Sequence, residues 1–233
     1  MSAATAWALS RAGIPYQFLG PGRLYKQPEV KDLIAYLKVL YNFEDNVAMY
    51  RVLTMAWMGI EARDVAVLLN YSRKYGISLF EACEFVAKRF LEELSSGQNS
   101  PAPAKILSLI APSVSVLTGE KLKELVKMIH RHLGLIKKET AGQILYYFLQ
   151  DTGILEQFAS YKSPVDERIA GNIAKFFNKL KTYEGQHDDA SVFTVVDWID
   201  LAMELGESPL ATDTDWSRNN AVNILTIHSA KGL

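Results

Sequence analysis

Apolar residues recur at helical spacing through almost the whole middle of this chain, whereas strand-type runs occur only near its two ends. Within residues 28–41, Val30, Leu33, Ile34 and Leu37 follow the i, i+3, i+4, i+7 pattern of one helix face. Helices of this kind carry one apolar stripe each and bury it against neighbouring elements. The pattern therefore predicts a mainly helical fold.

Seven further segments repeat the helical period, namely residues 47–58, 65–75, 79–94, 122–133, 144–150, 169–180 and 192–205. The two strand-type segments are residues 14–19 and 222–227. Two short strands at opposite ends of a helical block indicate that the block is inserted into a sheet-containing domain. We therefore expect the two strands to lie together in space.

Composition narrows the class of protein. The 233 residues are 49% hydrophobic and 22% charged, as in ordinary globular proteins, and the net charge of -1 excludes a global positive field. Any contact with nucleic acid must therefore be local. The single cysteine excludes an internal disulfide, and no apolar run approaches the roughly 20 residues that cross a bilayer. Because the first residues also lack an export signal, we expect a cytoplasmic protein without membrane contact.

The first of two polar motifs covers residues 20–32 and begins with a Gly-Pro-Gly turn. Gly20 allows close approach of the backbone, and we expect Arg23 and Tyr25 to point outward. An arginine there suits a phosphate contact and a tyrosine suits a stacked base. The alternative is an ordinary turn before a helix.

The second motif follows the last strand and runs Thr226-Ile-His-Ser-Ala-Lys-Gly-Leu233. The hydroxyls of Thr226 and Ser229, the imidazole of His228 and the ammonium of Lys231 are short-range donors for the phosphates of a single strand. A polar cap on a buried strand is the alternative. Its position at the very end of the chain favours an excised piece of a longer protein.

Together these motifs resemble those of the UvrD/Rep/PcrA group of superfamily 1 DNA helicases. Residues 20–32 are similar to the group's G-x-x-F-x-x-x-x-E-I-K-D element, and residues 226–233 to its motif five. In that group a helical insertion, the 2B subdomain, interrupts the RecA-like α/β second motor domain, 2A. The resemblance implies that residues 1–44 and 216–233 belong to 2A and that residues 45–215 form 2B.

The resemblance also implies a function. The chain would be part of an ATP-dependent 3′–5′ DNA helicase whose 2B subdomain contacts the duplex junction, regulates unwinding and binds accessory repair or replication proteins. Single-strand contacts would lie at its 2A ends. ATP and Mg²⁺ are implied for the parent protein, but no G-x-x-x-x-G-K-[ST] phosphate loop occurs here. We therefore expect this piece alone to be inactive, with no catalytic or cofactor-binding residue.

A third candidate site is the stretch of residues 57–64. It stands where the group often has an R-G-I-G turn that meets a duplex phosphate through N–H groups at a helix N-terminus. In this chain Met58 replaces the basic residue and Glu61 the second glycine. Gly59 and Arg63 remain as DNA-binding candidates, and the alternative is a weakened or absent duplex contact.

The other clusters of charged residues and histidines give weaker indications of a binding site. Glu120 and Glu124 dilute the basic residues of segment 121–132, which favours a solvated helix face over a DNA contact. His130 and His132 have no cysteine or carboxylate at ligand spacing, so we expect no metal site.

Two other functional classes stay open. A translocating subunit of a helicase-nuclease of the AddA/RecB type shares these motifs and would carry a nuclease domain elsewhere. A helical adaptor that binds proteins and never touches DNA is the second alternative.

Overall fold

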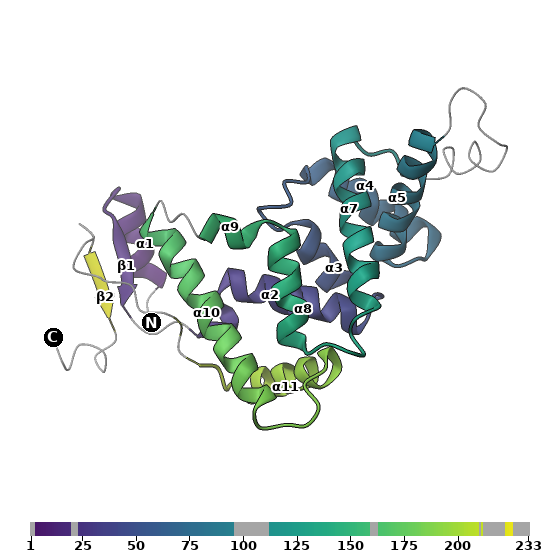
Figure 1. Cartoon of the computed structure of the whole chain (residues 1–233). Helices are drawn as coiled ribbons and strands as arrows, with labels where there is room; N and C mark the ends of the chain where they lie inside the picture. The colour runs from purple at the N-terminus through teal and green to yellow at the C-terminus, as the bar shows by residue number, and fades with distance from the viewer. Residues whose placement is uncertain are drawn as a thin grey trace.

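The computed structural model describes residues 3–19, 23–95, 112–158, 163–209, 211 and 222–225. These residues form a mainly helical protein (Figure 1). Its helices are α1 (Ala3–Arg11), α2 (Pro28–Tyr41), α3 (Asn46–Leu53), α4 (Ala62–Tyr75), α5 (Leu79–Ser95), α7 (Val116–Leu133), α8 (Ala141–Asp151), α9 (Ile154–Phe158), α10 (Pro164–Glu184) and α11 (Val192–Glu204). A 3₁₀ turn, η1 (Leu24–Lys26), and two strands, β1 (Tyr16–Leu19) and β2 (Val222–Leu225), complete the set.

The two strands pair with each other in parallel, although they come from opposite ends of the chain. Tyr16 lies opposite Val222 in the register, and the Val222 N–H donates to the Pro15 carbonyl at 2.8 Å. Parallel neighbours require a long crossover connection, which the helical block supplies here. The expectation that the two ends lie together is therefore confirmed, and Figure 1 shows the pair at one end of the molecule with α4, α5 and α7 at the other.

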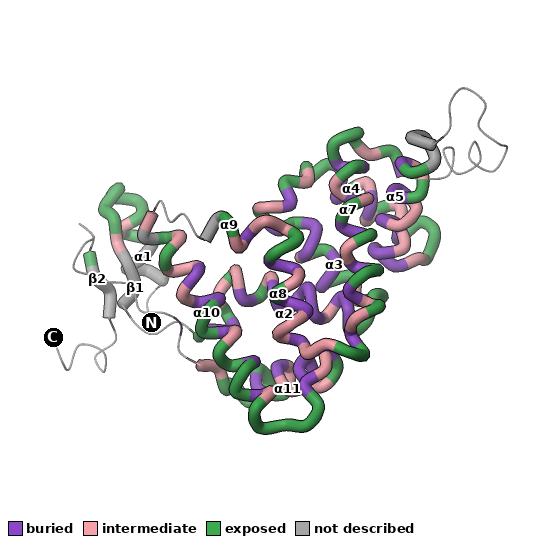
Figure 2. Tube along the Cα trace, in the orientation of Figure 1, coloured by how far each residue is buried: buried purple, intermediate pink, exposed green. Residues whose placement is uncertain are grey.

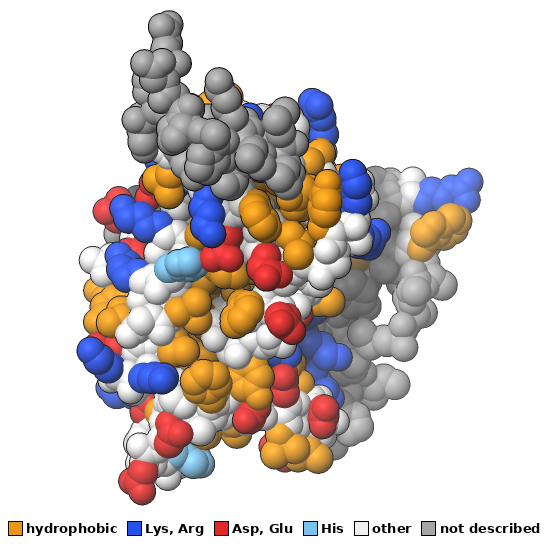
Figure 3. Space-filling view, turned by 90° about the vertical axis from the view of Figure 1, so that its right-hand side faces the viewer, with side chains coloured by type: hydrophobic (Ala, Val, Ile, Leu, Met, Phe, Trp, Pro, Cys, Tyr) orange, Lys and Arg blue, Asp and Glu red, His pale blue; other side chains and the backbone are white. Residues whose placement is uncertain are grey.

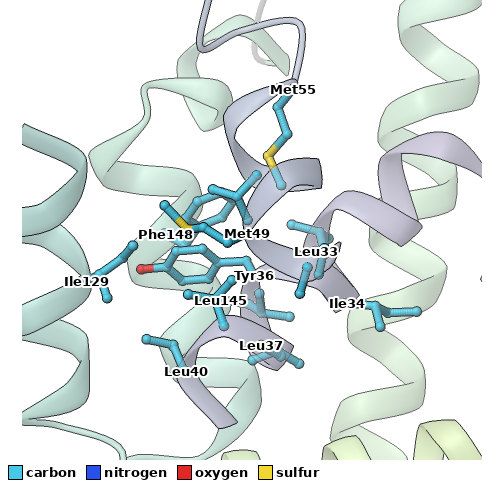
Figure 4. Packing of buried hydrophobic residues seen from close by; sticks show 14 of the residues in the cluster. Leu33, Ile34, Tyr36, Leu37, Leu40, Met49, Met55, Ile129, Leu145 and Phe148 are labelled. Carbon is cyan, nitrogen blue, oxygen red and sulfur yellow. The ribbon is translucent and has the colours of Figure 1, made fainter. Parts of the chain in front are cut away.

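Helix α2 is the centre of the hydrophobic core. It packs against α3, α7, α8, α10 and α11, and eight of its fourteen residues are buried. The Tyr36 ring stacks on Phe148 with centroids 3.9 Å apart, and Met49 and Leu145 lie beside them (Figure 4). Each fully buried aliphatic or aromatic side chain contributes about 1.5–3 kcal/mol. Figure 2 shows that the buried positions of the helices lie where the helices face one another.

Short polar residues fix where several helices begin. The Asp45 carboxylate accepts from the N–H groups of Val47 and Ala48 at the start of α3, and Ser115 accepts from Thr118 at the start of α7. Such caps satisfy N–H groups that have no partner inside the helix.

Among the described helices, α5 and α7 make the most extensive contact. Gly119 of α7 allows this, because a Cβ atom built there would lie 2.0 Å from the Phe90 ring. None of the helices in the described ranges is long and apolar enough to span a membrane.

Candidate nucleic-acid interface

The turn between α3 and α4 is the candidate duplex contact, and its backbone explains its glycine. Helix α3 ends at Leu53, and the Thr54 hydroxyl donates to the carbonyls of Tyr50 and Arg51. Gly59 then adopts a φ of 55°, a left-handed conformation that side-chain-bearing residues rarely adopt. The chain is thereby turned so that α4 starts at Ala62.

A buried carboxylate holds this turn against α7. Asp64, in the first turn of α4, accepts from the Ser115 hydroxyl at 2.7 Å and from the Ser115 N–H at 3.2 Å. Burial acts to raise the Asp64 pKa, but hydrogen bonds from Thr118 and Ser115 outweigh it and leave the pKa below its ordinary value. The N-termini of α4 and α7 are therefore locked together by an ionised side chain.

Lys121 of α7 makes a second contact with the same turn. The Lys121 ammonium donates to the Gly59 carbonyl at 2.7 Å. Arg63 is exposed on the first turn of α4, where the N–H groups of Ala62 and Arg63 have no carbonyl within the helix to bond. The turn thus carries two basic side chains and a helix N-terminus, which suit an anion, although the ionised Asp64 in the same first turn offsets part of their charge.

Two residues of this turn differ from the R-G-I-G pattern, namely Met58, which is apolar, and Glu61, which is acidic. Met58 is buried in the core, so the position of the group's basic residue has become a packing position. Glu61 is exposed directly before α4. A carboxylate there opposes a phosphate, and the site therefore depends on Arg63 and Lys121.

The first sequence motif, residues 20–32, makes hydrogen bonds within the chain through its residues 23–25. The Arg23 guanidinium donates to the Gly206 carbonyl at 2.8 Å, and the Leu24 N–H donates to the Pro209 carbonyl at 2.8 Å. The Tyr25 N–H donates to the Ser208 hydroxyl at 3.1 Å. Residues 206–209 therefore fasten η1 to the end of α11.

The expectation that Tyr25 points outward is wrong. Its side chain is only 2% exposed and packs edge-on against Phe176 with ring centroids 6.2 Å apart. Burial raises the Tyr25 pKa to about 12. The 3₁₀ turn rotates this ring into the core instead of leaving it on the surface, so Tyr25 does not offer a face for a stacked base. Arg23 remains exposed, although its guanidinium is engaged by Gly206.

The remaining candidates are Gly20, Thr226, His228, Ser229 and Lys231, and they lie outside the described residues. Strand β2 ends at Leu225, directly before the second motif in the sequence.

The charges on the surface are mixed. Figure 3 shows acidic and basic side chains interspersed with apolar ones on the face viewed there. In the described ranges no group of three His, Cys, Asp or Glu side chains is placed to hold a metal ion.

The two histidines of α7 have different environments, which their spacing did not reveal. His130 lies on the surface with its Nε2 2.6 Å from the Glu84 carboxylate. His132 is fully buried among Tyr36, Arg131 and Asp151. Desolvation, with a smaller effect of the Arg131 charge, lowers the His132 pKa to about 4.

Comparison with known proteins identifies relatives over nearly the whole chain. Residues 3–233 match the family described as UvrD-like helicase C-terminal domain. ATP-dependent DNA helicase UvrD1 of Mycobacterium leprae is 31% identical over 227 residues, and DNA helicase II of Escherichia coli is 24% identical over 231 residues. ATP-dependent DNA helicase PcrA of Leuconostoc citreum is 22% identical over 231 residues. The matches cover 95% to 97% of this chain but only 27% to 28% of those proteins.

Proposed function

The chain belongs to the UvrD-like helicase C-terminal domain family, and we propose that it is the insertion-bearing part of an ATP-dependent DNA helicase that moves 3′ to 5′. The observation that carries this proposal is the parallel pairing of β1 with β2 around a helical block. A two-stranded parallel pair is too small to be stable alone and normally belongs to a larger sheet covered by helices. That arrangement is the one expected of a motor domain interrupted by an insertion.

The strand pair and α1 are then part of the motor domain 2A, and the helices form the insertion 2B. Resemblance places residues 1–44 in 2A and residues 45–215 in 2B. Helix α2, however, packs within the helical core against α3 and α11, and it would move with 2B. We therefore propose that the mechanical boundary lies before η1 and not after residue 44.

The function of 2B in this proposal is to hold the duplex ahead of the motor through the turn between α3 and α4. Arg63, Lys121 and the N-terminus of α4 supply the positive charge, and the ionised Asp64 keeps the turn fixed against α7. Since the chain as a whole is nearly neutral, its attraction for DNA has to come from local sites such as this turn.

The single strand would pass the other end of the chain. Thr226, His228, Ser229 and Lys231 follow β2, and their donors would contact successive phosphates there. The parent protein would supply the ATP and Mg²⁺ site, and 2B would also offer a surface to accessory proteins.

Strand displacement by the whole protein that carries this chain tests the proposal. With ATP and Mg²⁺, it is expected to unwind a duplex with a 3′ single-stranded tail and to leave a duplex with a 5′ tail intact. Unwinding of the 5′-tailed duplex alone would contradict the polarity, and failure on both would contradict the helicase assignment.

A further inference from the structure

A groove of about 710 Å³ runs along α7, on the side bordered by Trp57 and Met58 and by the C-terminal end of α8. Its apolar lining includes Leu117, Leu125 and Met128. No element in the described part of the chain fills it. Leu117 is 58% exposed, so the groove leaves a large apolar side chain in water.

The apolar lining is suited to another helix. The groove follows α7 from Leu117 to Arg131, which is roughly 21 Å or about four helical turns. Two methionines, Met58 and Met128, contribute to the lining, and flexible thioether side chains adapt to the apolar face of an incoming helix.

The charges on the rim change sign along the groove. Glu120 and Glu124 border the half near the start of α7, and Lys127 and Arg131 border the other half. Lys121 also lies in the acidic half and offsets one of its two negative charges, while its ammonium is held toward the Gly59 carbonyl.

The ion pairs of the remaining charged residues preserve the change from acidic to basic along the groove. Asp151 also lines the groove and pairs with Arg131, so Lys127 carries the net positive charge of that half. In the other half Glu124 is 65% exposed and lies 3.7 Å from the Lys123 ammonium. The two glutamates would repel a DNA phosphate, which makes nucleic acid a poor occupant of the groove.

We propose that this groove binds an amphipathic helix of a protein partner, antiparallel to α7, with acidic residues in its first turn and basic residues in its last. In that orientation the partner's last turn lies over Glu120 and Glu124, and its first turn lies over Lys127. This order is also the one that helices favour by themselves, because acidic groups stabilise an N-terminus and basic groups a C-terminus. Charge complementarity and intrinsic helix stability therefore select the same partner. The inference identifies the chemistry of an accessory partner and does not require that the chain bind DNA.

Two designed peptides of about 14 residues test the orientation. Both carry the same leucine stripe; one has three glutamates in its first turn and three lysines in its last, and the other has these charges exchanged. Their composition and net charge are identical. By fluorescence polarisation, the first is expected to bind this chain several-fold more tightly than the second. The second peptide can match the groove charges only in the parallel orientation, in which its own charges oppose its helix dipole.

Variants of the chain test whether the first peptide binds in the groove. Leu117→Asp is expected to weaken binding of the first peptide at least about fivefold. Leu201→Asp is the matched control, because Leu201 is 56% exposed on α11, outside the groove. Circular dichroism checks that both variants keep their helical content. The double variant E120K/E124K makes both halves of the rim positive and is expected to weaken binding of the first peptide several-fold, whereas Glu204→Lys, on α11, is expected to leave it unchanged.

Four results would overturn the proposal. Equal affinity for the two peptides would contradict the antiparallel orientation, and unchanged binding of the first peptide by E120K/E124K would remove the charge argument. Absence of binding by either peptide would remove the groove as a helix site. If duplex DNA displaced the peptide, and Leu117→Asp abolished binding of that DNA, the groove would be assigned to nucleic acid.

Discussion

The imidazole Nδ1 of His132 lies 2.5 Å from the phenolic oxygen of Tyr36, and neither side chain is exposed to solvent. The other ring nitrogen, Nε2, lies 3.2 Å from the Asp151 carboxylate. The Arg131 guanidinium, which can only donate, lies 3.1 Å from the same Nε2. A neutral imidazole has one donor and one acceptor nitrogen, so Nε2 accepts from Arg131 and Nδ1–H donates to the Tyr36 oxygen. This contact joins α2, α7 and α8 at the centre of the core, and it has consequences for stability.

Acid is expected to destabilise the protein through His132. The unfolded side chain binds a proton near its ordinary pKa of 6.5, whereas the folded one resists protonation down to about 4. The unfolded state therefore binds more protons between these values, and stability is lost as the pH falls through this window, by on the order of 2 to 3 kcal/mol. Urea unfolding at pH 7, 5.5 and 4.5 measures the loss.

The variant His132→Gln provides the control for that experiment, because other groups also titrate. Its stability is expected to be lower at pH 7 but to fall less between pH 7 and 4.5 than that of the wild type. Parallel pH profiles for the two proteins would show that His132 does not titrate in this way.

Tyr36→Phe removes the hydroxyl but keeps the stacking on Phe148. The buried Nδ1 of His132 loses its partner, and the free energy of unfolding is expected to fall by about 1–3 kcal/mol. Tyr50→Phe, at a half-exposed position on α3, is expected to change it by less than about 0.5 kcal/mol. Similar losses in the two variants, measured by urea unfolding, would mean that the buried contact contributes little.

Gly119→Ala and Gly142→Ala form a matched pair within helices. At Gly119 the new methyl group meets the Phe90 ring, and we expect a net loss of about 1–3 kcal/mol despite the better helix propensity of alanine. At Gly142 the nearest atom is the flexible end of Glu184, and we expect a gain of up to about 1 kcal/mol. Thermal unfolding of both variants measures the two changes in stability. If Gly119→Ala were as stable as Gly142→Ala or more so, the close contact between α5 and α7 at Gly119 would not be needed.

Asp64→Asn tests the link between α4 and α7. Because hydrogen bonds hold the Asp64 pKa below its ordinary value, the ionised form stabilises the fold above that value and the contribution is lost as the pH falls below it. The variant is expected to lose about 1–3 kcal/mol at pH 7. In a double-mutant cycle with Ser115→Ala the two losses should not add, and strict additivity would show that the pair does not interact.

Sequence reasoning located α2 at residues 28–41 as the structure has it, because a proline at its start and an unbroken apolar stripe define it locally. It could not find α9, since five residues are too short to show a period. The inward turn of Tyr25 depends on η1 being fastened to residues 206–209, and the environment of His132 depends on α2 and α8. Both arise from contacts between distant parts of the chain, which a local pattern does not contain.

Anisotropy of labelled DNA tests the central claim, that the turn between α3 and α4 contacts duplex DNA, most directly. The chain is expected to bind a fork and a duplex more tightly than a single strand, with affinity that falls as salt is raised. Arg63→Ala should weaken duplex binding several-fold, whereas Arg73→Ala, on an exposed position at the other end of α4, should not. No binding to any of the three DNAs at low salt, or an equal effect of the two variants, would contradict the account.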